Sequence, residues 1–172
     1  MEYVVKPMSR KDIRKKAEFV RKLQNAESTL YFDIMGFLEH TLPILFPGFT
    51  LSIGTVAEMG ENHGLTFPDK NEIKLREDVY EGALNGNGRD RLTASHELFH
   101  FLVHSKKSIA FARTGSGEKP RYTDPEWQAD AFGGELLIPH MLAKNLTIDE
   151  IVENCGVSSK AARCQYKIMH KM

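Results

Sequence analysis

The stretch that decides the fold of this chain reads Arg91-Leu92-Thr93-Ala94-Ser95-His96-Glu97-Leu98-Phe99-His100-Phe101-Leu102-Val103-His104. It contains good helix formers and neither Gly nor Pro, so it predicts a helix. At about 3.6 residues per turn, His96 and His100 lie one turn apart on one face, where both imidazoles can bind the same ion. Glu97 is offset by about 100 degrees, so its carboxylate can act on a water molecule beside the metal. The spacing predicts a zinc site with Glu97 as catalytic base.

An alternative interpretation of the same string is an ordinary helix that carries two surface histidines and a surface glutamate. The residues between and after the histidines oppose this alternative, because Leu98, Phe99 and the run Phe101–Val103 make the helix apolar almost all round. Such a helix is expected to be buried. Buried His and Glu side chains need partners, and a metal ion supplies them.

A catalytic zinc ion takes three protein ligands, so a second element must supply the third. Residues 123–139 predict a helix that is capped by Thr123 or Asp124 and ended by Pro139. On it, Glu126 and Asp130 share one face, which predicts Glu126 as the third ligand and Asp130 as the acceptor of a ligand imidazole N–H.

Helix chemistry alone offers another interpretation of Glu126, as a first-turn carboxylate stabilised by the helix dipole. Glu135 lies roughly opposite Glu126 on the same helix and is expected to be solvated or structural. No oxyanion donor is singled out among His104, Arg121 and Tyr122.

The N-terminal residues 1–45 predict two scaffold helices. The first runs from Ser9 to about Asn25, and the second covers Ser28 to His40, before Pro43. The basic face of the first helix is expected to be a solvated surface rather than a nucleic-acid contact, because acidic residues elsewhere balance its charge. Its cations are Lys11, Arg14, Lys15, Lys16, Arg21 and Lys22.

Between residues 49 and 76, short β-prone segments with turn residues between them predict three strands, at 49–53, 64–67 and 72–76. We therefore expect an α+β fold, mostly helical, with a small antiparallel β-sheet that precedes the His-Glu-x-x-His helix. The expected organisation is one domain over 1–172, with N-terminal helices in 1–45, the sheet in 49–76, the zinc-site helices in 90–139 and a C-terminal helical pair in 140–172.

The C-terminal pair is predicted by a capping box at Thr147–Glu150, a break at Gly156 and a restart at Ser158. It either forms a helix-turn-helix that contacts DNA or closes the core, and the second is favoured because few cations line its last helix. Residues 105–124 predict a mobile loop that is cut by proteases near Gly115–Gly117.

The composition excludes several classes of protein. Apolar residues make up 41% and charged residues 27%, which is typical of a globular chain, and 23 basic residues balance 23 acidic ones, so no global field favours nucleic acid. Cys155 and Cys164 form no C-x-x-C pair, which predicts neither a disulfide framework nor a thiolate zinc site. Without a signal-like start or an apolar run of about 18 residues, we expect a cytoplasmic protein that does not bind membranes.

The two predicted site helices resemble those of the ImmA/IrrE-like metallopeptidases, which pair a helix reading AHELGH with one reading roughly ExxAnxFAxxLLMP. Here these segments are Ser95–His100, SHELFH, and Glu126–Pro139, EWQADAFGGELLIP. The resemblance extends from Phe49 to the C-terminus and implies a zincin-like domain with a gluzincin-like Zn²⁺ site in which Glu126 is the third ligand. Phe99 replaces the usual Gly and is expected to narrow or reshape the pocket beside the helix, and Gly133-Gly134 replaces the usual Ala pair.

Members of this family are similar to site-specific proteases that cleave transcriptional repressors, often helix-turn-helix proteins of mobile elements or stress regulons. The resemblance therefore implies a zinc-dependent metalloendopeptidase with a protein substrate, such as a helix-turn-helix repressor. The alternative is a non-catalytic regulator that binds DNA or a protein through its C-terminal helical pair. The sequence makes no prediction about the oligomeric state.

Overall fold

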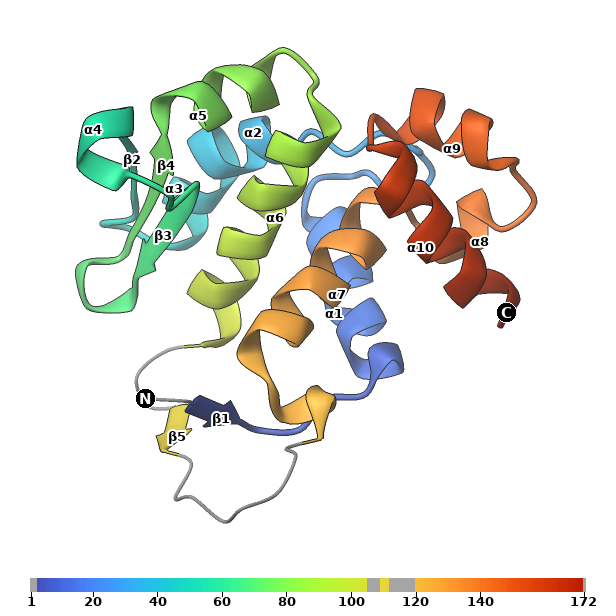
Figure 1. Cartoon of the computed structure of the whole chain (residues 1–172), viewed down its shortest axis with the longest axis horizontal. Helices are drawn as coiled ribbons and strands as arrows, with labels where there is room; N and C mark the ends of the chain where they lie inside the picture. The colour runs from blue at the N-terminus through green and yellow to red at the C-terminus, as the bar shows by residue number, and fades with distance from the viewer. Residues whose placement is uncertain (1–2, 105–108, 112–119, 172) are drawn as a thin grey trace.

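The computed structural model describes residues 3–104, 109–111 and 120–171. Its centre is a pair of helices that lie side by side, α6 (Gly88–Val103) and α7 (Pro125–Leu137) (Figure 1). A small sheet lies on one side of α6, and α1 (Arg10–Leu23) lies along α7. The fold is α+β and mostly helical, as a zincin-like domain is expected to be.

Helix α7 begins and ends as the sequence predicts, whereas α6 begins at Gly88, three residues before the predicted start at Arg91, and ends at Val103. The Asp124 side chain accepts a hydrogen bond from the Glu126 backbone N–H, Pro125 occupies the first turn, and α7 ends two residues before Pro139. The small residue Gly133 lies where the helices meet, since a Cβ there would be 2.7 Å from Leu92 Cδ1. The glycine thus permits the close approach of α7 to α6.

The three predicted strands are present as β2 (Thr50–Gly54), β3 (Gly64–Phe67) and β4 (Glu72–Arg76). Their order is β2-β4-β3, with β3 antiparallel and β2 parallel to β4. The prediction of a purely antiparallel sheet is therefore wrong. The sequence analysis missed the short helix α4 (Val56–Met59), which connects β2 to β3. This connection places β3 at the far edge of the sheet, and β4 then lies between β2 and β3 and runs in the direction of β2.

The first N-terminal helix is confirmed as α1, with Ser9 and Asp12 forming a reciprocal capping box. It is preceded by β1 (Tyr3–Val5), which pairs antiparallel with β5 (Ile109–Phe111). This pairing was not predicted. It joins the N-terminus to the connection between the two central helices (Figure 1).

The second predicted helix, Ser28 to His40, is wrong at both ends. The chain becomes helical only at α2 (Ile34–Gly36), passes through a π-helical turn at Phe37–Thr41 and continues as α3 (Leu42–Leu45). Pro43 has no N–H to donate to the Glu39 carbonyl, and in a regular helix its pyrrolidine ring would collide with that carbonyl. The wider π turn makes room for the proline ring.

The remaining helices surround this centre. They are α5 (Glu77–Leu84), α8 (His140–Ala143), α9 (Ile148–Cys155) and α10 (Ser159–His170), with short 3-10 turns at Pro68–Lys70 and Arg121–Thr123. The predicted caps of the C-terminal pair are all present: Thr147 with Glu150, Gly156 at φ 64°, and Ser158. The pair buries Ile151, Cys155, Ala162 and Met169 against the core.

Among the described residues, no helix is long and apolar enough to cross a membrane. Most of the predicted mobile loop, including its expected protease site at 115–117, lies outside the described residues.

Candidate metal site

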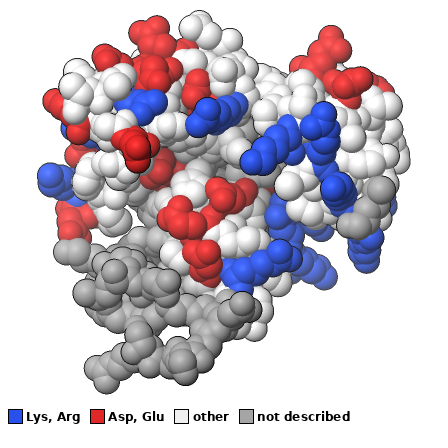
Figure 2. Space-filling view, in the orientation of Figure 1, with Lys and Arg blue, Asp and Glu red and all other residues white. Residues whose placement is uncertain are grey.

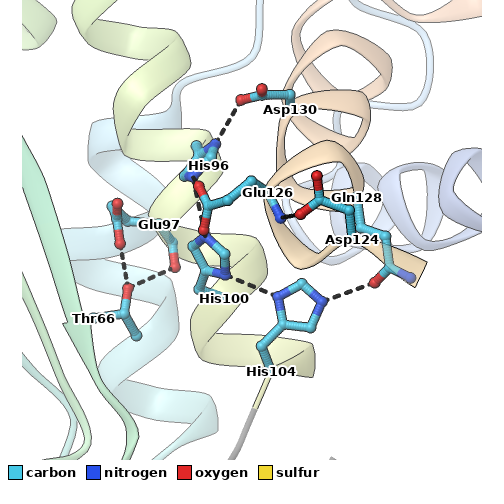
Figure 3. Close-up of polar contacts among 9 residues, drawn as sticks. All are labelled: Thr66, His96, Glu97, His100, His104, Asp124, Glu126, Gln128 and Asp130. Carbon is cyan, nitrogen blue, oxygen red and sulfur yellow. Dashed lines mark hydrogen bonds and ion pairs between the residues drawn. The ribbon is translucent and has the colours of Figure 1, made fainter. Parts of the chain in front are cut away.

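Three potential ligand residues, His96, His100 and Glu126, meet between α6 and α7 (Figure 3). His96 Nε2 lies 3.0 Å from His100 Nε2 and 3.0 Å from Glu126 Oε2, and His100 Nε2 lies 3.1 Å from Glu126 Oε1. The histidines come from successive turns of α6, and Glu126 comes from the first turn of α7. The packing of the two helices thus brings together the three residues that the sequence predicts as ligands.

The donor set matches the requirements of zinc. Zinc bonds of about 2.0 to 2.1 Å in a tetrahedron place neighbouring ligand atoms about 3.3 to 3.4 Å apart. The observed separations of 3.0 to 3.1 Å fall a few tenths of an ångström short of this value. Two imidazoles and one carboxylate suit zinc, whereas calcium and magnesium prefer oxygen ligands. These three residues leave a fourth position for water or substrate.

The second carboxylate of this face, Asp130, binds the other side of His96. Its Oδ1 lies 2.7 Å from His96 Nδ1, so the remaining nitrogen, Nε2, is directed at His100 and Glu126. Burial alone would lower the pKa of His96, but the hydrogen bonds with Asp130 and Glu126 raise it to about 10. Hydrogen bonds from His100 and His96 hold the pKa of Glu126 well below its usual range. The carboxylates of Glu126 and Asp130 thus favour a positive charge at His96 and His100, either a proton or a metal ion.

Glu97 is almost completely buried and lies against strand β3. The Thr66 hydroxyl lies 2.5 Å from Glu97 Oε2 and 3.1 Å from the Glu97 carbonyl oxygen, and it donates to this pair (Figure 3). A Cβ on Gly64 would lie 2.8 Å from Glu97 Cγ, so the strand can approach only because this residue is glycine. The sequence analysis missed both residues. Strand alternation places them on the same face of β3 and could have indicated them.

A cleft of about 400 Å³ opens above the three potential ligands. One wall is β3 with its flanking residues, and the other is the first turn of α7. The lining residues are Asn62, Gly64, Leu65, Thr66, Pro68, His96, Glu97, His100, His104, Pro125 and Glu126.

The expectation that Phe99 narrows this pocket is wrong. Phe99 is fully buried and does not line the cleft; its ring centroid lies 4.8 Å from that of Phe132 and 5.1 Å from that of His104. Like the side chain of the neighbouring Leu98, the Phe99 side chain points into the core rather than toward the metal face.

The three residues left open as oxyanion donors differ in their surroundings. His104 is buried, which lowers its pKa to about 4, and it contacts His100 and Gln128. The Arg121 guanidinium lies 5.6 Å from the centre of the Trp127 ring, and Tyr122 is exposed. Neither Arg121 nor Tyr122 lines the cleft.

Glu135 lies outside the site and is structural. It is buried and accepts hydrogen bonds from Arg10 at 2.9 Å and from Arg14 at 3.0 Å, which attaches α1 to α7. The basic face of α1 is therefore only partly solvated: Arg14 is paired and Arg21 is buried. The predicted exposure holds for its lysines, Lys11, Lys15, Lys16 and Lys22.

Comparison with known proteins is consistent with this geometry. The IrrE N-terminal-like domain, a family of M78 peptidases, matches residues 55–163, a range that contains the sheet strands β3 and β4, both central helices and the start of α10. No curated protein matched the chain. A match over more than half of the sequence, in a family of metal-dependent peptidases, means that this chain belongs to the ImmA/IrrE-like metallopeptidases.

Proposed function

We propose that this chain is a zinc-dependent metalloendopeptidase in which His96, His100 and Glu126 bind the metal and Glu97 is the catalytic base. The observation that carries the proposal is the meeting of His96, His100 and Glu126, whose nearest ligand atoms are 3.0 to 3.1 Å apart in each pair, in a cleft that Glu97 also lines. Zinc supplies a Lewis acid when it is bound, which polarises the scissile carbonyl and acidifies water.

The protein side chains divide the remaining work. Glu97 accepts the proton of the attacking water and passes it to the leaving amine, without a covalent intermediate. Thr66 holds the Glu97 carboxylate in place, and Asp130 holds the His96 ring so that its Nε2 faces the metal.

We infer that the substrate is an extended segment of a specific regulatory protein, a transcriptional repressor of the helix-turn-helix type. Among the described residues, β3 pairs only with β4, so its other edge, beside the cleft, is available to pair with an extended peptide. The resemblance of the two site motifs to those of repressor-cleaving proteases supports this class of substrate.

The test combines metal analysis with a cleavage assay. The full chain, purified with zinc present, is expected to hold about one zinc per molecule, and co-expression with the regulators encoded beside its gene is expected to give fragments that mass spectrometry identifies. Glu97→Gln is expected to keep the zinc and abolish cleavage, whereas Glu153→Gln, an exposed change on α9, leaves both intact. A chain that holds no zinc, or a Glu97→Gln variant that still cleaves, would refute the proposal.

A second candidate function rests on the outer face of α10. Lys160, Arg163 and Lys167 are exposed there, the helix contains no acidic residue, and Figure 2 shows basic side chains gathered over it. This surface favours a regulator that binds DNA or an acidic partner. DNA binding that weakens with salt and survives zinc chelation would support it over the peptidase.

A further inference from the structure

A chain of hydrogen bonds leads from His100 into the interior, on the side of its ring away from Glu126 (Figure 3). His100 Nδ1 lies 2.8 Å from His104 Nδ1, and His104 Nε2 lies 2.8 Å from Gln128 Oε1. The Gln128 amide nitrogen then donates to two backbone carbonyls, those of Lys6 at 2.8 Å and Tyr122 at 2.7 Å. His104 and Gln128 are both buried.

The two carbonyls fix the orientation of Gln128 and the direction of its contact with His104. A flipped Gln128 amide would set its oxygen against two other oxygens, so its NH₂ faces the carbonyls of Lys6 and Tyr122 and its Oε1 can only accept. His104 must therefore donate from Nε2. The other nitrogen of His104, Nδ1, faces His100 Nδ1 at 2.8 Å, so one of these two atoms donates and the other accepts.

The direction continues to the ligand. Because His104 keeps a proton on Nε2, its Nδ1 can accept from the Nδ1–H of His100, the tautomer that a histidine needs to bind a metal through Nε2. His100 Nε2 then carries a lone pair, and this atom is the one that lies 3.0 Å from His96 Nε2 and 3.1 Å from Glu126 Oε1. The lone pair thus points to where the proposed metal would bind.

We propose that His104 and Gln128 are positioning residues that hold His100 in its Nδ1–H tautomer, so that its Nε2 is ready to bind the metal. This inference rests on the proposed metal site. The two histidine ligands are then held by different kinds of partner: His96 by the exposed carboxylate of Asp130, and His100 by the buried side chains of His104 and Gln128.

One of the two carbonyls that anchor these hydrogen bonds, that of Lys6, lies outside the segment 55–163 that matches the family. Lys6 belongs to the N-terminal segment between β1 and α1, and the Met8 N–H donates at 3.2 Å to the same Tyr122 carbonyl that receives Gln128. The N-terminal residues thereby support a metal ligand that is about 94 positions away in the sequence, through contacts that only the tertiary structure creates.

The direct test is the tautomeric state of the histidines in the full-length protein. With ¹⁵N-labelled histidine, long-range ¹H–¹⁵N spectra are expected to show His104 protonated on Nε2 with and without zinc, and His100 protonated on Nδ1 when zinc is bound. Each ring is assigned by its absence in a single His→Gln variant. A metal-free spectrum without a proton on His104 Nε2, or a zinc-bound spectrum with His100 protonated on Nε2, overturns the proposal, whether or not the protein is a peptidase.

Zinc affinity gives a second readout, measured with zinc alone and a competing chelator. His104→Leu keeps the contact with Phe99 but removes both polar atoms, and it is expected to weaken zinc binding about 10- to 100-fold. His104→Gln restores an acceptor for His100 and a donor for Gln128, so it is expected to recover most of the affinity. Gln128→Met is expected to resemble His104→Leu.

The control is His40→Gln, because the His40 side chain is 80% exposed and takes no part in the chain of hydrogen bonds. Circular dichroism and the melting temperature establish that each variant is folded. Equal zinc affinity in folded His104→Leu and His104→Gln overturns the proposal, while a wild-type protein that binds no zinc refutes the proposed function and leaves the metal-free tautomer of His104 to decide this inference.

Discussion

At the residue scale, one hydroxyl group controls the orientation of the proposed base. Glu97 is the buried carboxylate of the cleft, and Thr66 on the neighbouring strand donates to it at 2.5 Å. A carboxylate that moves through several rotamers would be correctly aimed for only part of the time, so a fixed orientation raises the fraction of productive encounters. Gly64, two positions earlier, leaves the space that this contact needs.

We predict that Thr66→Val lowers kcat about 10-fold without changing zinc affinity. Valine keeps the shape and the strand preference but removes the hydrogen bond, and a bond to a charged group contributes about 1.5 to 3 kcal/mol. Steady-state kinetics on a substrate fragment that spans the cleavage site measure the change in kcat. Thr66→Ser, which keeps the hydroxyl, is the control, and equal kcat in the two variants would contradict the role of Thr66.

At the scale of elements, the site depends on how closely α6 is held by its neighbours. A Cβ on Gly88, the first residue of α6, would lie 2.5 Å from the Ser158 backbone nitrogen and 2.5 Å from the Val157 carbonyl carbon. A Cβ on Gly133 of α7 would instead meet the end of the Leu92 side chain at 2.7 Å. The first contact is with backbone and cannot relax, whereas the second is with a side chain that can rotate.

We predict that Gly88→Ala destabilises the protein by about 3 kcal/mol and that Gly133→Ala costs about 1 kcal/mol, values that span the usual range for overpacking. Urea unfolding followed by circular dichroism measures both free energies. Alanine has the higher helix propensity, by about 1 kcal/mol, so a more stable Gly88→Ala variant would show that α6 and the turn before α10 are not in close contact.

At the scale of the whole molecule, two buried arginines join parts of the chain that are far apart in sequence. Arg21 of α1 donates to the carbonyls of Thr29 and Leu30 and, at 2.7 Å, to that of Leu136 at the end of α7. Arg91 of α6 donates to the carbonyls of Phe32, Cys155 and Gly156, and its guanidinium lies 4.0 Å from the centre of the Tyr31 ring. We propose on this basis that residues 1–172 form a single domain.

We predict that Arg91→Met lowers the free energy of unfolding by about 3 kcal/mol, because three carbonyls lose a charged donor and two of these contacts are buried. Arg91→Lys is expected to lose nearly as much, since one ammonium group cannot reach all three acceptors. Arg89→Met, an exposed change on the same helix, is the control. Thermal unfolding should remain one transition by fluorescence and by circular dichroism; two separate transitions would contradict the single domain.

The sequence by itself determined the two central helices, the three strands of the sheet and the residues proposed to bind the metal. Helical periodicity placed His96, Glu97 and His100 on α6, and capping residues such as Asp124 and Ser158 marked where helices begin, because these signals act within one turn of the chain. The pairing of Glu126 with the two histidines was also predictable, since the site chemistry requires a third ligand and the second motif offers one.

The tertiary structure decided what depends on contacts between distant segments. The carbonyls of Thr29 and Leu30 accept hydrogen bonds from Arg21, and that of Phe32 accepts one from Arg91, so they are not free for helical bonds and the predicted second helix begins late. The direction of β2 relative to β4 follows from the path through α4, which no strand pattern encodes. The partners of Glu97 and His100, namely Thr66, His104 and Gln128, gain their roles only when β3, α6 and α7 pack together, because a hydrogen bond depends on distance in space and not on separation in sequence.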